Sequence, residues 1–265
     1  MLLKIQHISK YTYEEAVPYA LQRIRLTPQT TRSQKVHDWT INYHGASREV
    51  LYRDGFGNVT ELVRNERNAL DMTITVGGTI ETFNNSGVEG EDNGPTPLWT
   101  WLRQTPLTTP GPSVLALAAE FAEPLERLET LHRLLERVHG RIRFVVGATD
   151  TTTDAETALN ASEGVCQDHA HVFASIARIL GIPARYVSGY LLIDGETQQA
   201  ASHAWAEAHV DGIGWVGFDA ANGVSPDERY VRLATGLDYR DAAPISGIRH
   251  GTGGESLAVH IDVEQ

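Results

Sequence analysis

Residues 164–192 read GVCQDHAHVFASIARILGIPARYVSGYLL, and this stretch predicts a helix followed by a buried strand. Apolar side chains recur at helical spacing over residues 166–180, which predicts a helix with one face in the protein core. Gly181 is suited to end that helix, and Pro183 lies just beyond it. The apolar run over 184–192 then predicts a strand. The single cysteine of the chain is therefore expected at the first position of a helix packed on a sheet.

Strands over 204–210 and 215–218 flank the sequence Asp-Gly-Ile-Gly, a turn signal that predicts an antiparallel hairpin. His203 begins the first strand and Asp219 ends the second. If the turn has an odd length centred on Asp211, His203 lies directly opposite Asp219 on the same face, with the two Cβ atoms about 5 Å apart. An even-length turn would place the two side chains on opposite faces of the sheet.

Cys166, His203 and Asp219 together are the residue types of a cysteine-based acyl-transfer site. A helix N-terminus carries about half a positive charge and free N–H groups, which stabilise a thiolate and also an oxyanion on an attacked carbonyl. The histidine can take the thiol proton, and the aspartate can fix the imidazole tautomer. The alternative is a buried structural cysteine, together with a surface histidine and a turn aspartate.

A zinc site is another interpretation, because Cys166, His169, His203 and Asp219 offer ligand types that zinc accepts. The acyl-transfer interpretation explains the cysteine, His203 and the aspartate without a metal. The sequence also contains no calcium loop of the EF-hand type. We therefore expect neither a metal nor another cofactor.

The remaining sequence predicts an α+β protein with two parts. Residues 1–83 contain short alternating stretches with Asp-Gly and Gly-Asn turns, which predict an antiparallel β domain, either a sandwich or a small barrel. Residues 84–96 are rich in Gly, Asn and acidic residues and predict a linker. Residues 97–265 are expected to form the core that carries the candidate site.

Within the core, helices are expected over residues 113–121 and 155–159. A longer helix is expected to start at Pro124 and to end at Gly140, because leucines recur at three-and-four spacing between them. The alternating residues 256–263 are expected to add a closing strand to the core.

Several stretches resemble the transglutaminase-like superfamily, and their order and spacing make the resemblance specific. They are residues 143–149, 164–171, 181–190, 202–207 and 214–219, which carry the Cys, His and Asp blocks. Three N-terminal stretches resemble the β domain that precedes the core in many bacterial members: residues 11–13, 22–28 and 54–58. The resemblance covers nearly the whole chain.

This resemblance implies a papain-like core in which a helix bearing the cysteine packs on an antiparallel sheet. It implies that Cys166 is the nucleophile, His203 the general base and acid, and Asp219 the orienting carboxylate. The implied reaction is acyl transfer from a carboxamide, peptide or isopeptide bond through a thioester, ending in hydrolysis or transamidation of a peptide or protein substrate. A non-catalytic binding or scaffold protein on the same fold is the alternative function.

Three further residues are weaker candidates for binding substrate or an oxyanion. Gln167 follows the cysteine and could help to hold an oxyanion, while His169 lies three positions after the cysteine on the same helix face. Trp205 is expected to wall the site or to fill the core. One departure from the family pattern is Ala220-Ala221, where members commonly have Pro-Thr after the aspartate.

Composition excludes several classes of function. The chain has 265 residues with 22 Lys and Arg against 34 Asp and Glu, a net charge of −12 that does not suit a nucleic-acid-binding protein. No apolar stretch is long enough for a membrane span, and the N-terminus does not read as a signal peptide. With one cysteine, an intramolecular disulfide is impossible. We expect a cytoplasmic protein, and the sequence leaves its oligomeric state open.

Overall fold

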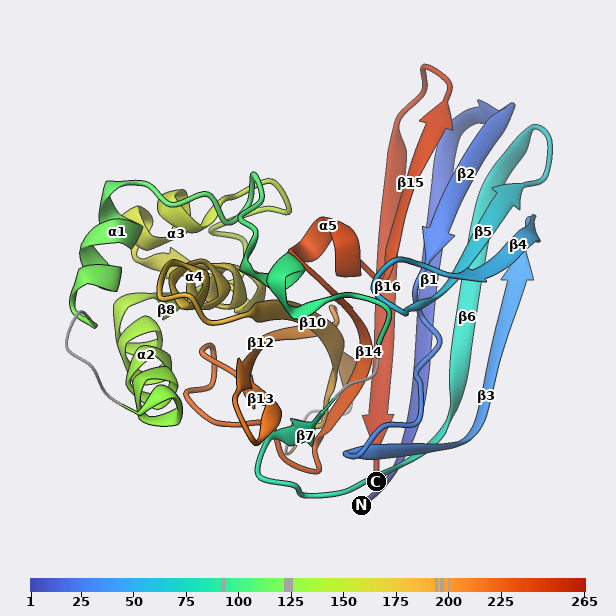
Figure 1. The fold of residues 1–265 in the computed structure, drawn as a ribbon. Helices are drawn as coiled ribbons and strands as arrows, with labels where there is room; N and C mark the ends of the chain where they lie inside the picture. Colours follow the sequence, from blue (N-terminus) through green and yellow to red (C-terminus); the bar gives the residue numbers. More distant parts are fainter. Residues whose placement is uncertain (92–93, 122–125, 194, 196–197, 200) are drawn as a thin grey trace.

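Figure 1 shows the protein as a computed structural model, which describes all residues except 92–93, 122–125, 194, 196–197 and 200. A β-sandwich stands beside a mixed core, in which helices cover one side of an antiparallel sheet (Figure 1). The predicted α+β fold class is therefore confirmed. Among the described residues, no helix combines the length and the apolar character that crossing a membrane requires.

The elements follow the chain in this order. The strands are β1 (Leu2–Val17), β2 (Tyr19–Ile24), β3 (Gln34–His44), β4 (Ala46–Arg53), β5 (Val59–Asn65), β6 (Ala69–Thr82), β7 (Val88–Gly90), β8 (Arg143–Phe144), β9 (Glu163–Gly164), β10 (Ala184–Leu191), β11 (Gln198–Gln199), β12 (His203–Val210), β13 (Gly214–Phe218), β14 (Tyr230–Gly236), β15 (Ile245–His250) and β16 (Glu255–Glu264). The helices are the 3-10 helix η1 (Leu98–Leu102), α1 (Pro112–Ala119), α2 (Arg127–Arg141), α3 (Ala155–Ala161), α4 (Cys166–Ile179) and α5 (Tyr239–Ala242).

The sandwich consists of two antiparallel sheets, in the orders β11-β16-β1-β6-β3 and β15-β2-β5-β4. Alternate residues of β1 are buried, including Leu3 and Ile5, and they pack with Ile74 and Ile80 of β6. This period of two is the one that the sequence shows over residues 1–83, because successive side chains of a strand point to opposite faces.

The last two strands belong to the sandwich, although the sequence predicted a closing strand of the core. β15 pairs with β2, and β16 pairs with β1 over ten residues, from Lys4↔Glu264 to Tyr13↔Glu255. The reason is side-chain packing: Ile261 and Val263 are fully buried in the same apolar cluster as the β1 side chains. Figure 1 accordingly shows the two ends of the chain side by side.

The expected linker region also contains sheet structure. Strand β7 lies within residues 84–96 and pairs with β13, so it forms one edge of the core sheet, whose order is β14-β10-β12-β13-β7. Residues 92–93 of the expected linker lie outside the described residues. The chain therefore passes from sandwich to core by way of a short edge strand.

Helix α4 lies at the centre of the core. It packs against β12 and β10 on one side and against α1, α2 and α3 on the other. The buried Val172, Phe173 and Ile176 form the apolar stripe that the sequence shows. Helix α2 ends one residue after the expected Gly140, and its expected start at Pro124 lies outside the described residues. Because α4 is packed on both sides, its first residue, Cys166, is held in a fixed position.

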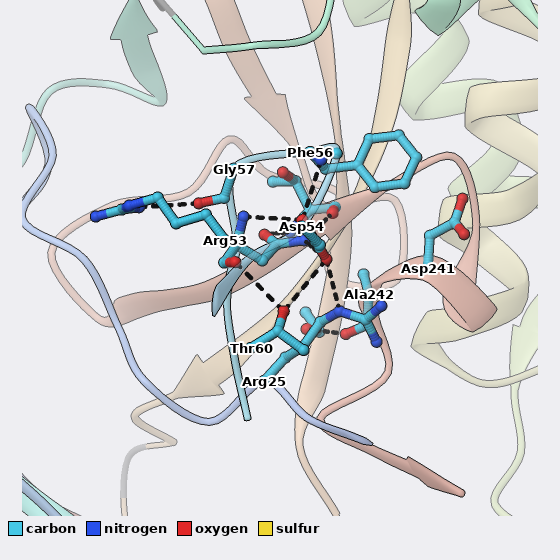
Figure 2. Close-up of polar contacts among 12 residues, drawn as sticks. Arg25, Arg53, Asp54, Phe56, Gly57, Thr60, Asp241 and Ala242 are labelled. Carbon is cyan, nitrogen blue, oxygen red and sulfur yellow. Dashed lines mark hydrogen bonds and ion pairs between the residues drawn. The ribbon is translucent and has the colours of Figure 1, made fainter. Parts of the chain in front are cut away.

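The turn at Asp54 fixes the sandwich to the core. Figure 2 shows the Asp54 carboxylate receiving hydrogen bonds from the Phe56 N–H at 3.0 Å and from Arg25 Nε at 2.9 Å. Asn58, in the same turn, donates to the Thr235 carbonyl on β14 at 2.7 Å and accepts from the Thr235 N–H at 2.8 Å. These two hydrogen bonds therefore join a turn of the sandwich to strand β14 of the core sheet.

Candidate active site

Cys166 occupies the first position of α4, as the sequence predicts. The Asp168 carboxylate fixes the backbone just before it, because it accepts the Val165 N–H at 2.7 Å and the Thr149 hydroxyl at 2.6 Å. A Cβ at Gly164 would lie 2.7 Å from this carboxylate, so the close approach requires glycine. Burial raises the pKa of Asp168, and the two hydrogen bonds oppose that rise. The result is a rigid helix start for the thiol.

His203 and Asp219 meet through a hydrogen bond of 2.7 Å between His203 Nε2 and Asp219 Oδ2. The hairpin turn has three residues and is centred on Gly212, not on Asp211. The register therefore differs by two residues from the one predicted, and His203 and Asp219 are diagonal rather than direct neighbours. Since side chains alternate with a period of two, the shift keeps both residues on the same face, as predicted.

Asp219 is fully buried and saturated with hydrogen-bond donors. Its Oδ1 accepts the backbone N–H groups of Ala221 at 3.0 Å and Asn222 at 3.2 Å. Besides His203, its Oδ2 accepts the Asn222 side-chain amide and the Tyr230 hydroxyl, both at 2.7 Å. The Ala220-Ala221 departure thus leaves the carboxylate well held, because the bond at residue 221 comes from the backbone. Sequence reasoning missed Asn222 and Tyr230.

The charges of the site reinforce one another. Burial works against a charged His203, but hydrogen bonds to Asp219 and Cys166, together with their negative charge, raise the pKa of His203 to about 10. Burial likewise opposes a charged Asp219, yet the hydrogen bond and charge of His203 hold the pKa of Asp219 below its usual value. Because Nε2 of His203 faces Asp219, Nδ1 is the ring nitrogen left for the Cys166 thiol.

The three weaker candidates have different surroundings. Gln167 lines the cleft at Cys166 and makes a hydrogen bond with Tyr239. Trp205 lies beneath the histidine: it is 3% exposed, its ring stacks on that of His203 with centroids 6.3 Å apart, and it meets Tyr230 edge-on. Trp205 therefore supports the imidazole from the core side.

His169 is not brought to the cleft. Its Nδ1 lies 2.8 Å from the Val165 carbonyl and its Nε2 lies 3.0 Å from the Ile142 carbonyl, so both ring nitrogens face the backbone. It ties the start of α4 to the end of α2. His169 could join Cys166 as a zinc ligand only by leaving both carbonyls, and the described residues hold no group of three metal-ligating side chains.

A cleft of about 580 Å³ opens at Cys166 and His203. The core supplies one side of it, and β1, β15 and β16 of the sandwich supply the other. The residues that line it are His7, Ser9, Tyr11, Phe144, Val146, Thr151, Val165, Cys166, Gln167, Leu191, Ile193, Gln198, Ala201, Ser202, His203, Tyr239, Pro244, Ile245, Leu257 and Val259. A substrate that reaches the thiol therefore touches both parts of the protein.

Two family models match separate parts of the chain. The model described as the transglutaminase-like superfamily matches residues 115–220, and the model of the bacterial transglutaminase-like N-terminal region matches residues 3–81. The first match contains Cys166, His203 and Asp219. The second falls on the strands of the sandwich that precede the core.

Relatives of similar length occur in mycobacteria. An uncharacterized protein of Mycobacterium leprae is 28% identical over 98% of both chains, and one of Mycobacterium tuberculosis is 28% identical over 98% of this chain and 91% of its own. A protein-glutamine gamma-glutamyltransferase of Pseudomonas aeruginosa is 28% identical over 52% of this chain, but over only 23% of its own length.

A solved structure shares the fold. It is a crystal structure from Cytophaga hutchinsonii, described as "a Putative Cysteine Protease", with a TM-score of 0.77 and 21% sequence identity. The similarity covers 100% of this chain and 91% of the other, so it includes the sandwich as well as the core.

Proposed function

Because the chain belongs to the transglutaminase-like superfamily, we propose that it is a cysteine-dependent acyl-transfer enzyme with Cys166, His203 and Asp219 as its catalytic residues. The observation that carries this proposal is the order of the groups at the cleft. Asp219 holds Nε2 of His203 at 2.7 Å, which turns Nδ1 toward a thiol at the first position of a helix. A protein that only binds partners has no need of this alignment.

The first step is attack of the Cys166 sulfur on a carboxamide or peptide carbonyl. His203 takes the thiol proton on Nδ1, and the new S–C bond converts the carbonyl oxygen into an oxyanion. The positive end of α4 lies at the sulfur and favours this negative charge. His203 then donates the proton to the leaving nitrogen, so ammonia or an amine departs and a thioester remains.

The second step reverses these roles. Water or a primary amine gives a proton to His203, attacks the thioester carbonyl, and releases the acyl group as an acid or as a new amide. Cys166 recovers its proton, so no net change occurs in the protein. Throughout, Asp219 keeps the imidazole in one tautomer and stabilises its protonated form.

The test mixes the purified protein, or its Cys166→Ala variant, with a glutamine-containing protein and a primary-amine reporter. Mass spectrometry then follows amine incorporation and new peptide termini, while a coupled assay follows ammonia. Incorporation indicates transamidation, ammonia alone indicates a deamidase, and new termini indicate a peptidase. Each signal should vanish in Cys166→Ala.

A second measurement is independent of the substrate. Iodoacetamide should label Cys166 faster than it labels free cysteine, and His203→Ala should slow that labelling. A Cys166 that reacts no faster than free cysteine, with His203→Ala without effect, would contradict the proposal and favour a binding protein on the same fold.

A further inference from the structure

The cleft beside Cys166 has a wall of exposed apolar side chains. Phe144 is 51% exposed, Val146 83%, Ile193 38% and Leu257 50%. They come from three separate regions of the chain, namely β8 and the residues after it, the segment after β10, and β16, yet all line the same cleft. Water-exposed apolar groups that gather from distant segments mark a surface that is covered when a ligand binds.

The sandwich supplies a continuous part of this wall. Tyr11 of β1 pairs with Leu257 of β16, and Ser9 pairs with Val259, so these four side chains share one face of the sheet, and that face lines the cleft. The N-terminal part of the protein is therefore a component of the cleft.

The part of the cleft wall that the structure describes is also poor in charged side chains. Its described lining residues include no Asp, Glu, Lys or Arg, although these residues make up 21% of the chain. His7, which lines the cleft, is bonded to the Tyr190 hydroxyl and to Ser9, each at 2.9 Å. Burial lowers the pKa of His7 to about 4, so this imidazole is neutral near pH 7. Apart from the reacting pair Cys166 and His203, the described lining residues therefore carry no charge near pH 7.

We propose that the acyl donor carries bulky uncharged apolar side chains next to the carbonyl that Cys166 attacks, and that Leu257 of the sandwich is a specificity-determining contact for them. This inference rests on the proposed acyl-transfer function. A charged side chain at this position would leave water without gaining a partner from the described lining residues, whereas a leucine or phenylalanine would cover apolar surface.

The experiment uses N-acetyl-Gly-Xaa chloromethyl ketones, in which Xaa is Leu, Phe, Asp or Lys and stands next to the reactive carbonyl, as irreversible acyl-donor analogues that alkylate Cys166. Mass spectrometry of the intact protein gives each labelling rate, which is divided by the iodoacetamide labelling rate of the same protein. This ratio removes differences in the thiol itself. The Leu and Phe reagents should label at least about tenfold faster than the Asp and Lys reagents.

Two matched variants test whether the preference for the Leu and Phe reagents depends on Leu257. Leu257→Asp should reduce the ratio for the Leu and Phe reagents about tenfold. Ile248→Asp is the control, because Ile248 is 66% exposed on the neighbouring β15 and lies outside the cleft lining, so its ratio should stay that of the unmodified protein.

The outcomes distinguish a wrong donor preference from a wrong function. Equal ratios for all four reagents, or equal effects of the two substitutions, would overturn the apolar-donor inference while leaving the acyl-transfer function intact. An iodoacetamide rate no higher than that of free cysteine, and insensitive to His203→Ala, would instead overturn the proposed function itself.

Discussion

Replacing Asp219 with asparagine should damage this site far more than the similar shapes of the two side chains suggest. Five donors surround the carboxylate: three on Oδ2, each at 2.7 Å, and two backbone N–H groups on Oδ1 at 3.0 and 3.2 Å. An asparagine amide has only one acceptor atom. Whichever way it is oriented, its NH₂ group points at groups that themselves donate.

The cheaper orientation puts the NH₂ group against the two backbone donors, because this keeps the contact of the amide oxygen with His203. The N–H groups of Ala221 and Asn222, whose bonds to Asp219 are only partly buried, then lose their acceptor at about 1 kcal/mol each, the lower end of the usual range, so stability should fall by roughly 2 kcal/mol. The negative charge disappears at the same time, and the pKa of His203 should fall from about 10, since burial then faces less opposition. The histidine should therefore hold the thiol proton less well.

The assay has two readouts, the midpoint of urea unfolding and the pH profile of Cys166 labelling by iodoacetamide. Asp219→Asn should lower the midpoint and slow labelling near pH 7 by at least about tenfold. The control is Asp227→Asn, because Asp227 is partly exposed and binds Arg229 close by in sequence. If Asp219→Asn kept both the wild-type midpoint and the wild-type pH profile, the inference that the site needs two acceptor oxygens and a negative charge at residue 219 would be refuted.

Three further perturbations probe the surroundings of the site. Tyr230→Phe removes one of the five donors, so labelling should slow only a few-fold and stability should fall by about 1 kcal/mol in urea unfolding; a loss as large as that of Asp219→Asn would contradict this. Glu207→Gln removes the buried carboxylate that Arg185 and Arg232 share, and calorimetry should show a loss of about 3 kcal/mol, against under 1 kcal/mol for the exposed control Glu49→Gln. Burial lowers the pKa of His7 and of His171 to about 4, so the unfolded chain binds protons between that pH and 6.5 that the folded chain does not. The contribution of these two residues should be complete above pH 6.5 and should be lost toward pH 4, while that of His203, whose pKa is raised to about 10, stays constant in this window because it changes only above pH 6.5. Fluorescence-detected unfolding between pH 6.5 and 4 should therefore show stability falling on acidification, and a rise would refute the sign.

Local sequence patterns predicted the elements that carry the site. The helix from Cys166, the strand β10 and the hairpin of β12 and β13 each occur where periodicity and turn signals placed them. These elements are governed by interactions within a few residues, such as helical spacing and turn chemistry, which a single sequence displays directly.

Partners that depend on tertiary contacts were not predictable in this way. Strand β14 is buried at nearly every position, so it shows no alternation that would mark it as a strand, and its Tyr230 could not be placed next to Asp219. The alternation of β16 predicted a strand correctly but did not reveal that β1 is its neighbour. His169 has the right helical spacing for the site, yet the carbonyls of Val165 and Ile142 take both of its nitrogens.

The pairing of β16 with β1 sets an order of events during folding. The wall that carries Leu257 and Val259 lies on a strand that follows the nucleophile in the chain, and this strand must return to the first strand to form the sheet. Contacts so distant in sequence form late and slowly. During synthesis Cys166 and His203 thus leave the ribosome before Leu257 and Val259, so the proposed donor contact can form only after the residues that carry the chemistry are already outside.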